Sequence, residues 1–589
     1  MNVKIALSAI IVMLFSTLCS AQAIIEACSP LYPTDLVVEG NVSYIASKGH
    51  NKLIVYDNGE VVGEAKFNES ATGVAVSEEF IFVTTSYSKG YLHKLSKDDY
   101  SIIATVETGM GAKAPIISND GLSVFVCNQF SNSVAKVDIA TMIVVGSLAV
   151  PREPFAAVQS KDGGKLFVNN FLPAQAASLD YVAADVTVID LNTMSVITNI
   201  KLSNGSNALR DIAITNDGRF VLVSHNLGRF QVPTSQLQQG WMNTNAMSVI
   251  DANSNNLIGS VLIDKPERGY AGIWGIATND DKIFISHSGV HEITIIDYPK
   301  FVAKLDAYQK KENLSIDLNF LYGIDTRVAI EGNGPRAVYS DGENFYTVTY
   351  FSDHLNTINA QGGEQSSIDL NHGRKESIVD EGERIFNDAA YCFQQWQSCN
   401  GCHPGEGRTD GMNWDLMNDN VGNPKNCKSM LYSHRTNPSM ISGIRETAEL
   451  AVRKGFTHIQ FSQISEEEAC KVDEYLKALR PLPSPHLDAN GELTELAKSG
   501  RKVFENRGCD ECHNGPLFTD QKMHIIGEDV EFEKGWDTPT LIETWRTAPY
   551  LFDGRAATME EVFSVHKHGI EGKISKKDLE ALVKYVNSL

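Results

Sequence analysis

The sequence lacks two features that would tie the protein to a membrane or to nucleic acid. Beyond residue 18 it contains no stretch of about 18 apolar residues, so no transmembrane segment is predicted. Positive charge is also scarce, because 51 Lys and Arg stand against 73 Asp and Glu, for a formal net charge of −22. Nucleic acid and anionic lipid repel a chain this acidic, so we expect neither as a partner. A basic redox partner protein, acting as electron donor or acceptor, would suit it.

Cysteine is scarce as well, with ten residues in 589, but four of the ten fall into two short motifs. Both motifs have the form C-x-x-C-H, in which two thiols bind one haem covalently and the His takes an axial position on iron. The motifs are Cys399-Asn400-Gly401-Cys402-His403 and Cys509-Asp510-Glu511-Cys512-His513. They predict two covalently bound haem c groups, with His403 and His513 as the proximal iron ligands.

The N-terminus has the pattern of a secretory signal peptide. Lys4 precedes an apolar run over residues 5–18, and Ala21-Gln22-Ala23 has the form of a cleavage site. We expect residues 1–23 to be removed and the mature protein to lie in the periplasm or outside the cell, where covalent haem attachment takes place.

Five cysteines remain once Cys19 in the signal and the four haem cysteines are set aside. Some of them can pair in an oxidising compartment. Cys392 and Cys427 flank the first haem motif, and we expect them either to form a disulfide or to be buried as small hydrophobic side chains.

Residues 24–370 repeat one pattern seven times: a strand, an Asp-Gly turn, a strand ending in V-x-N or V-x-S, and a strand ending in I-D or V-D. Clear copies begin near residues 116, 160 and 215, and degenerate copies lie near 36–67, 73–106, 273–297 and 336–360. A unit of three or four short strands cannot bury its faces alone, so the copies must stack and close radially. The sequence therefore predicts an all-β, seven-bladed propeller, which resembles the YVTN-type propellers of exported bacterial proteins.

Two features of the propeller leave alternatives open. Long loops at 171–184, 230–245 and 296–329 are expected either to form a binding face or to cover gaps and dock the second part of the chain. His225 and His287 occupy equivalent repeat positions, which favours either a metal site in the central channel or two buried, hydrogen-bonded histidines.

From residue 371 the pattern changes to amphipathic helices in two similar segments, 371–485 and 486–589. Gly382 and Phe386 match Gly500 and Phe504. The two haem histidines are 110 residues apart, from 403 to 513, and so are two matched arginines, from 445 to 555. We predict an all-α pair of tandem cytochrome c folds with one haem in each, so that the whole protein is multidomain.

The second segment carries the most specific resemblance. The stretch Thr538-Pro539-Thr540-Leu541, residues 548–555 and Thr558-Met559-Glu560-Glu561-Val562 resemble the bacterial di-haem cytochrome c peroxidase superfamily, which includes the di-haem enzyme that matures methylamine dehydrogenase. The resemblance covers about residues 375–589. It implies an oxidoreductase of the peroxidase-like type that passes electrons between its haems and acts on peroxide or another small molecule, with the propeller docking the substrate or partner.

The distal ligands of the two haems have several candidates. In the family the distal ligand of the second haem lies past the glycine matched by Gly554, which implies His566, twelve residues on. The internal repeat instead aligns His458 with His568. Residues two apart on a helix face different ways, so we expect only one of the pair to bind iron, and we favour His566. For the first haem the candidates are His458 and His434.

Two departures from the family bear on mechanism. The tryptophan that lies between the haems is replaced within Ile441-Ser442-Gly443-Ile444-Arg445, and the family's pocket glutamate has no match in residues 455–459. A catalytic haem needs an open distal position and an acid–base group, so no catalytic residue is predicted. Two alternatives follow: a non-catalytic electron-transfer cytochrome on a propeller scaffold, and a propeller-based dehydrogenase or lactonase that uses the cytochrome as acceptor.

Overall fold

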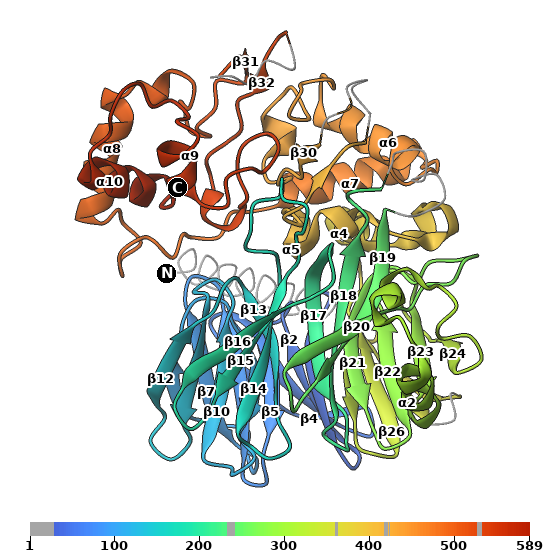
Figure 1. Ribbon diagram of the computed structural model, residues 1–589. Helices are drawn as coiled ribbons and strands as arrows, with labels where there is room; N and C mark the ends of the chain where they lie inside the picture. Colours follow the sequence, from blue (N-terminus) through green and yellow to red (C-terminus); the bar gives the residue numbers. More distant parts are fainter. Residues whose placement is uncertain (1–28, 233–241, 360–362, 417–421, 423, 527–532) are drawn as a thin grey trace, which may run out of the picture.

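The computed structural model describes residues 29–232, 242–359, 363–416, 422, 424–526 and 533–589 (Figure 1). It consists of a propeller of β-sheets, up to about residue 370, and a helical part, which lies over one end of the propeller. The predicted fold class, a seven-bladed propeller followed by a helical region, is confirmed. The predicted signal peptide, residues 1–23, lies outside the described residues.

Within the described residues, strands β1 to β28 form seven antiparallel sheets of four strands, each built from consecutive strands. The first strand of every sheet contacts the first strand of the next sheet, and β25 contacts β1, so these strands form a closed ring around the propeller axis. The innermost strands are β1 (Pro33–Glu39), β5 (Ser70–Val76), β9 (Ala112–Ile117), β13 (Pro154–Gln159), β17 (Ser206–Ile214), β21 (Ile273–Thr278) and β25 (Pro335–Ser340). The helical part supplies no strand to any of the seven sheets.

The other strands complete each blade outward from the axis. They are β2 (Val42–Ser47), β3 (Lys52–Asp57), β4 (Glu60–Lys66), β6 (Phe80–Ser86), β7 (Gly90–Ser96), β8 (Ile102–Glu107), β10 (Ser123–Asn128), β11 (Ser133–Asp138), β12 (Ile143–Ala149), β14 (Lys165–Asn170), β15 (Asp185–Asp190), β16 (Ser195–Lys201), β18 (Phe220–Gly228), β19 (Asn243–Asp251), β20 (Asn256–Leu262), β22 (Lys282–His287), β23 (Glu292–Asp297), β24 (Asp325–Ala329), β26 (Asn344–Thr349), β27 (His354–Asn359) and β28 (Glu364–Asp369).

The repeated residues form the turns and the core that the sequence pattern predicts. Gly121, Gly163 and Gly218 each close an Asp-Gly turn with a positive φ, between 70° and 77°, which glycine adopts without steric cost. Blades pack on one another through buried aliphatic and aromatic side chains. Between the first and last blades, Leu36 and Val38 share a core with Tyr346 and Val348, so apolar burial closes the ring.

The helical part contains six α-helices of six residues or more among the described residues, together with short helical turns and two small ladders. The longer helices are α3 (Ile378–Asn387), α6 (Ala448–His458), α7 (Glu466–Ala478), α8 (Glu495–Asn506), α9 (Met559–Ser564) and α10 (Lys576–Val586). The shorter elements are η3 (Ala389–Tyr391), η4 (Phe393–Gln395), α4 (Cys399–Cys402), α5 (Pro404–Gly407), η5 (Ser433–Arg435), η6 (Cys509–Glu511), η7 (Thr544–Arg546), and the strands β29 (Asn413–Trp414), β30 (Lys425–Asn426), β31 (Met523–His524) and β32 (Trp536–Asp537).

The long propeller loops serve packing and docking. In the loop at 171–184, Ala177 N donates to Gly554 O at 2.8 Å, which ties the propeller to the second segment of the helical part. The loop at 296–329 contains α2 (Tyr298–Ala307) and η2 (Lys311–Ile316), which pack against the fifth and sixth blades. The loop at 230–245 falls partly outside the described residues.

His225 and His287 are buried histidines with hydrogen-bond partners. His225 contacts Ser248 Oγ and a backbone carbonyl, and His287 contacts Thr294 Oγ1 and a backbone carbonyl. The described residues contain no group of three or more side chains suited to hold a metal ion. In the same part of the chain, no helix has the length and hydropathy needed to cross a membrane.

Candidate functional site

The first C-x-x-C-H motif forms one turn of helix, α4, that lies against the propeller. Cys399 and Cys402 are three residues apart on this turn, so both thiols lie on one side of it. Burial raises the pKa of the Cys399 thiol to about 12, and it raises the pKa of Cys402 well above the ordinary range. Redox catalysis uses a thiolate of lowered pKa, which burial at this turn does not provide.

The two motif histidines are held in the same way. His403 Nδ1 donates to Arg408 O at 3.2 Å, and His513 Nδ1 donates to Phe518 O at 3.1 Å. A carbonyl only accepts, so Nδ1 carries the proton and Nε2 keeps its lone pair for a metal. Burial lowers the pKa of His513 to about 4 and also lowers that of His403, so both rings are neutral at pH 7, as iron ligation requires.

The predicted internal duplication extends to the packing of the helices. Gly382 on α3 faces Lys471 O and Tyr475 on α7, and Gly500 on α8 faces Ala581 O and Tyr585 on α10. A Cβ at either glycine would lie about 2 Å from the facing carbonyl oxygen, so only glycine permits these crossings. Phe386 packs on Tyr475 with ring centroids 5.3 Å apart, and Phe504 packs on Tyr585 at 5.4 Å.

At the second motif, the structure brings His568 rather than His566 to the proximal histidine. The rings of His513 and His568 have centroids 6.3 Å apart. A metal–imidazole bond is about 2 Å, so one ion bound by both rings would hold the centroids roughly 6 Å apart. The proximity of His568 also contributes to the lowered pKa of His513. The separation therefore fits an iron between His513 and His568.

The helix-based argument for choosing between these histidines does not apply, because neither lies on a helix. Helix α9 ends at Ser564. The chain then turns, with Lys567 at φ 54°, and His568 N donates to Val562 O at 3.0 Å. This turn directs His568 back towards His513. A helix that continued through residue 568 would not have predicted this position.

At the first motif, the residue equivalent to His568 is Ser462. Ser462 N donates to Phe456 O at 3.0 Å, and the preceding residue, Phe461, has φ 50°, so the turn matches the one around Lys567. Helix α6 has eleven residues and α9 has six, although both begin at a capping threonine. Because α6 is longer than α9, the fixed offset of 110 residues that aligned His458 with His568 does not hold beyond the start of these helices. His458 is instead an exposed residue at the end of α6.

The other candidate ligand of the first haem, His434, is engaged elsewhere. Its Nε2 lies 3.0 Å from Asp473 Oδ1, and both side chains are at most 4% exposed. Asp473 also accepts a hydrogen bond from Arg453. His434 thus belongs to a buried polar cluster between α6, α7 and η5. Among the described residues, neither His434 nor His458 contacts His403.

Several residues around the first motif were not predicted from the sequence. Cys427 Sγ lies 3.0 Å from Cys402 O and 3.5 Å from His403 Nδ1. Cys392 and Cys427 are both free, so the disulfide considered for them is absent; Cys392 is buried and Cys427 is half-buried. Gln460 Nε2 contacts Cys399 Sγ at 3.8 Å, while its Oε1 is buried with no hydrogen-bond partner. Among the described residues, the Gln460 Oε1 acceptor beside Cys399 has no donor. It could therefore accept a hydrogen bond from a group bound at this site.

A buried ion pair joins the two segments of the helical part. Arg408 Nη2 lies 3.2 Å from Glu543 Oε1, and the side chains are 3% and 1% exposed. Asp410, two residues further along, is buried beside Trp414, whose Nε1 donates to it at 2.9 Å, and burial raises its pKa to about 7. The one signal in the sequence is the pair of charged residues in Arg408-Thr409-Asp410-Gly411, which begins five residues after His403.

The propeller also contributes directly to the first site. Asn243 Nδ2 lies 3.3 Å from Cys402 Sγ, and Asn226 Nδ2 donates to Gly401 O at 3.5 Å. These residues lie on β19 and β18 of the fifth blade, at the end covered by the helical part (Figure 1). The first C-x-x-C-H motif therefore lies at the junction of the two parts.

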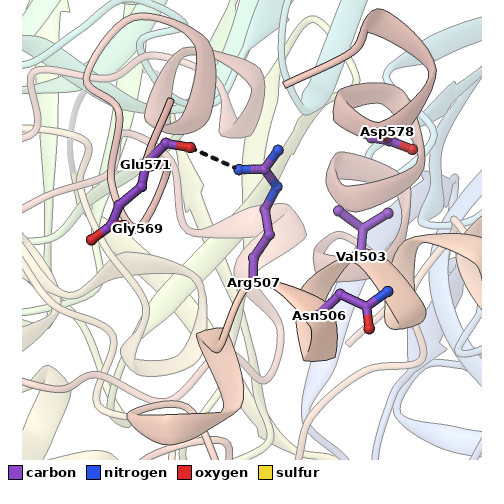
Figure 2. A pocket seen from close by; sticks show the side chains of 6 residues that line it. All are labelled: Val503, Asn506, Arg507, Gly569, Glu571 and Asp578. Atoms are coloured by element: carbon purple, nitrogen blue, oxygen red, sulfur yellow. Dashed lines mark hydrogen bonds between the residues drawn. The ribbon is translucent and has the colours of Figure 1, made fainter. Parts of the chain in front are cut away.

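The second site has a surface pocket nearby. The pocket, of about 510 Å³, is lined by Val503, Asn506, Arg507, Gly569, Glu571 and Asp578 (Figure 2). Figure 2 shows Arg507 pointing towards Glu571, whose carbonyl accepts from Arg507 Nη1 at 3.3 Å. Gly569 follows His568 directly, so the pocket borders the loop that carries the candidate distal ligand.

Comparisons with known proteins connect the chain to two groups. No protein-family model matches it. It is 28% identical to hydrazine synthase subunit gamma of Kuenenia stuttgartiensis, covering 36% of this chain and 78% of that subunit. It is 25% identical to subunit beta of the same enzyme, covering 38% of this chain and 59% of the subunit. It is also 24% identical to the cytochrome-c peroxidase IdrP2 of Denitromonas iodatirespirans, covering 33% of this chain and 74% of that protein.

A solved structure supports the fold. A chain of Kuenenia stuttgartiensis hydrazine synthase aligns with a TM-score of 0.52 and 21% identity, covering 57% of this chain and 97% of that one. Residues 371–589 make up little more than a third of this chain, so the alignment includes much of the propeller. The chain is therefore a homologue both of hydrazine synthase subunits beta and gamma and of the di-haem cytochrome c peroxidases.

Proposed function

We propose that this protein is an exported di-haem c-type cytochrome oxidoreductase whose two haem sites have different tasks. Cys399 and Cys402 would hold the first haem, and Cys509 and Cys512 the second. The observation that carries the proposal is the pairing of His568 with His513, against Ser462 at the equivalent position in the first segment.

The second site is assigned to electron transfer. With His513 on one side and His568 on the other, iron there would have no free position for a substrate. Bis-histidine ligation also favours a lower reduction potential than histidine with methionine. The pocket beside Gly569 gives a partner protein a place to approach this site from solvent, and the acidic chain suits a basic partner.

The first site is assigned to the chemical step. A haem bound there would supply redox chemistry at an iron with one open position, because a serine hydroxyl is a poor ligand beside an imidazole. The residues of this chain then have defined tasks. His403 would bind iron through Nε2, Arg408 O fixes its ring, and Asn243 and Gln460 position the two cysteines. Peroxide is the substrate that the resemblance to the peroxidases implies.

A second candidate function is that of a relay subunit in a larger assembly. The chain is similar to two different subunits of one enzyme, the beta and gamma subunits of hydrazine synthase, and joins both likenesses in one polypeptide. In this role the propeller would dock further subunits and neither haem would carry out bond chemistry. The propeller-based dehydrogenase or lactonase considered from the sequence gains no support, because the two candidate metal-binding histidines are used in hydrogen bonds.

The test is a cyanide titration of the purified holoprotein, after intact mass spectrometry has counted the haems. We expect two covalent haems and one bound cyanide per chain, because only the first site is open. Two covalent haems with no bound cyanide would favour the relay. Fewer than two covalent haems would refute the assignment of the motifs.

A further inference from the structure

The central channel of the propeller contains three cationic side chains that the proposed function does not use. Lys113 lies on β9, Arg210 on β17 and Arg336 on β25, which are all innermost strands of the ring. Arg210 and Arg336 are 6% and 9% exposed. Burial of this kind is costly for a cation unless an opposite charge or a set of hydrogen-bond acceptors compensates.

Aromatic rings hold these cations together at the channel axis. The Cζ atoms of Arg210 and Arg336 lie 4.0 and 4.1 Å from the centroid of one ring, that of Trp274 on β21. Both distances are measured to the same centroid, so the two guanidinium groups share one ring. Lys113 Nζ lies 3.0 Å from the centroid of Phe155, and the Arg210 Cζ lies 5.9 Å from the same ring. Arg210 is therefore linked through a shared ring to each of the other two cations, and its charge acts on both.

The hydrogen bonds of the cations leave donors unused. Arg210 has one, from Nη2 to Asn400 Oδ1 at a long 3.5 Å, and Arg336 has two, to Ser288 Oγ at 3.3 Å and Asn387 Oδ1 at 3.4 Å. Among the described residues, no carboxylate forms an ion pair with Lys113, Arg210 or Arg336, and Lys113 Nζ donates no hydrogen bond. Arg210 Nε and Nη1 are likewise without a protein acceptor in this part of the chain.

The nearby acidic groups are already engaged. Asp35 and Asp211 each accept two backbone N–H hydrogen bonds, and burial raises the pKa of Asp35 to about 6 and of Asp211 to about 7. Glu153 accepts a hydrogen bond from Gln129, and Glu406 pairs with Lys48. Glu383, near Arg336, has its pKa raised by burial. These carboxylates act on Lys113 and Arg336 from a distance, but among the described residues none of them forms an ion pair with the three cations.

We propose that Arg210, Arg336 and Lys113 bind one small planar oxyanion, of the nitrate or carboxylate class, in the channel beneath α4. A guanidinium group presents paired N–H donors to two oxygens of a planar anion, and the unused donors of Arg210 and Arg336 are suited to this. Trp274 and Phe155 add cation–π contacts to these cations. The anion would place a negative charge directly beside these three cations.

The haem propionates are not the missing anion. Cys399 and Cys402, one helical turn apart, would place the haem on their shared face of α4, whereas Asn400, which contacts Arg210, is one residue after Cys399 and so lies on a different face of the turn. Propionates, moreover, lie at the edge of the macrocycle opposite the thioether bonds. The proposed site is thus separate from both haem pockets, although it lies directly behind the first.

The test is isothermal titration calorimetry of the holoprotein with sodium nitrate, at pH 6 in a buffer of low chloride content. We expect one nitrate per chain and a loss of affinity of at least tenfold in Arg210→Gln. Arg210→Lys keeps the charge but loses the paired donors, so it should fold and bind more weakly than the wild type. Arg219→Gln is the matched control, because Arg219 is an exposed arginine near the same blade that pairs with Asp306, and its affinity should not change.

Two results would overturn this inference: no saturable heat with nitrate, or equal affinity in Arg210→Gln, Arg210→Lys and the wild type. Haem content and spin state are recorded on the same samples. Nitrate binding is expected whether or not the first haem proves open to cyanide, so the failure of this inference and the failure of the proposed function are distinguishable.

Discussion

The two segments of the helical part, residues 371–485 and 486–589, share their helix crossing and the position of their motif histidine. They differ in the residue that follows the turn after α6 and α9. In both, a glycine lets two helices cross, a histidine follows the second cysteine, and its Nδ1 donates to a backbone carbonyl five residues further on. In both, the chain turns back through a residue of positive φ after the helix. The residue after that turn is Ser462 in the first segment and His568 in the second.

If each segment binds a haem as proposed, this difference would let a duplicated fold acquire two tasks. The turn in the second segment brings His568 to His513, and the matching turn in the first segment carries Ser462. Under the proposed function, an imidazole would close the second site and the serine would leave the first one open. The first segment also contacts the propeller at Asn226 and Asn243, so the site proposed to be open is the one that the propeller supports.

The largest expected effect comes from removing a haem attachment. Cys402→Ala and Cys512→Ala should each lose one covalent haem, and the local helices should lose order because the macrocycle supplies much of their core. The loss of helix should be greater in Cys512→Ala, because the first segment is also held by Asn243, Asn226 and other propeller contacts. Intact mass and far-ultraviolet circular dichroism measure both effects.

The matched control is Cys470→Ala. Cys470 is an exposed free cysteine on α7, and its replacement should leave two haems and the helix content unchanged. A mass corresponding to two attached haems in Cys402→Ala or in Cys512→Ala would contradict the assignment of that motif.

The next effect should follow from exchanging the two distal residues. His568→Ala should convert the second haem from low spin to high spin and open it to cyanide, whereas His566→Ala should leave it low spin. Ser462→His should close the first haem, which would abolish cyanide binding at that site. Optical spectra with and without cyanide measure all three changes, and a spin change in His566→Ala alone would return the ligand role to His566.

The buried ion pair between the segments should have an effect on stability. Glu543→Gln leaves Arg408 buried without its partner, which costs about 3–5 kcal/mol in the free energy of unfolding. Glu495→Gln removes one partner of an exposed pair with Lys498 and should cause no measurable change. Denaturant unfolding of the holoprotein measures the difference, and equal midpoints for the two variants would show that the pair does not hold the segments together.

The smallest expected effect concerns pH and the propeller. Burial lowers the pKa of His225 to about 4 and of His287 to about 3, from 6.5. Between about pH 6.5 and pH 4, these two histidines are protonated in the unfolded chain but not in the folded one. The free energy of unfolding therefore falls as the pH drops through this range. This part of the slope should be smaller in His225→Gln and unchanged in His372→Gln, because His372 is 87% exposed. Identical slopes in all three proteins would contradict the pKa shift of His225.

Much of this architecture could be predicted from local sequence. The Asp-Gly turns are recognisable because glycine is needed for a positive φ, and the seven repeats imply closure because no single blade buries its own faces. The C-x-x-C-H motifs and the spacing of 110 residues indicate a duplicated haem fold, because both depend on residues close together in the chain.

The distal residues could not be predicted in the same way. The choice between His566 and His568 depends on where α9 ends, and helix ends are set by packing as much as by the residues at the end itself. Helix α6 is five residues longer than α9, so His458 does not occupy the place of His568. An alignment with one constant offset cannot include this difference in length. The pairing of Arg408 with Glu543 and the meeting of Lys113, Arg210 and Arg336 join residues far apart in the chain, for which one sequence has no signal.

The central claim is that one haem is open and the other is closed. Low-temperature electron paramagnetic resonance of the fully ferric holoprotein tests this directly, because high-spin and low-spin haem give separate signals. We expect one high-spin and one low-spin haem in equal amounts, with the low-spin signal lost in His568→Ala. Two low-spin haems in the wild type would contradict it, because both sites would then be closed to substrate.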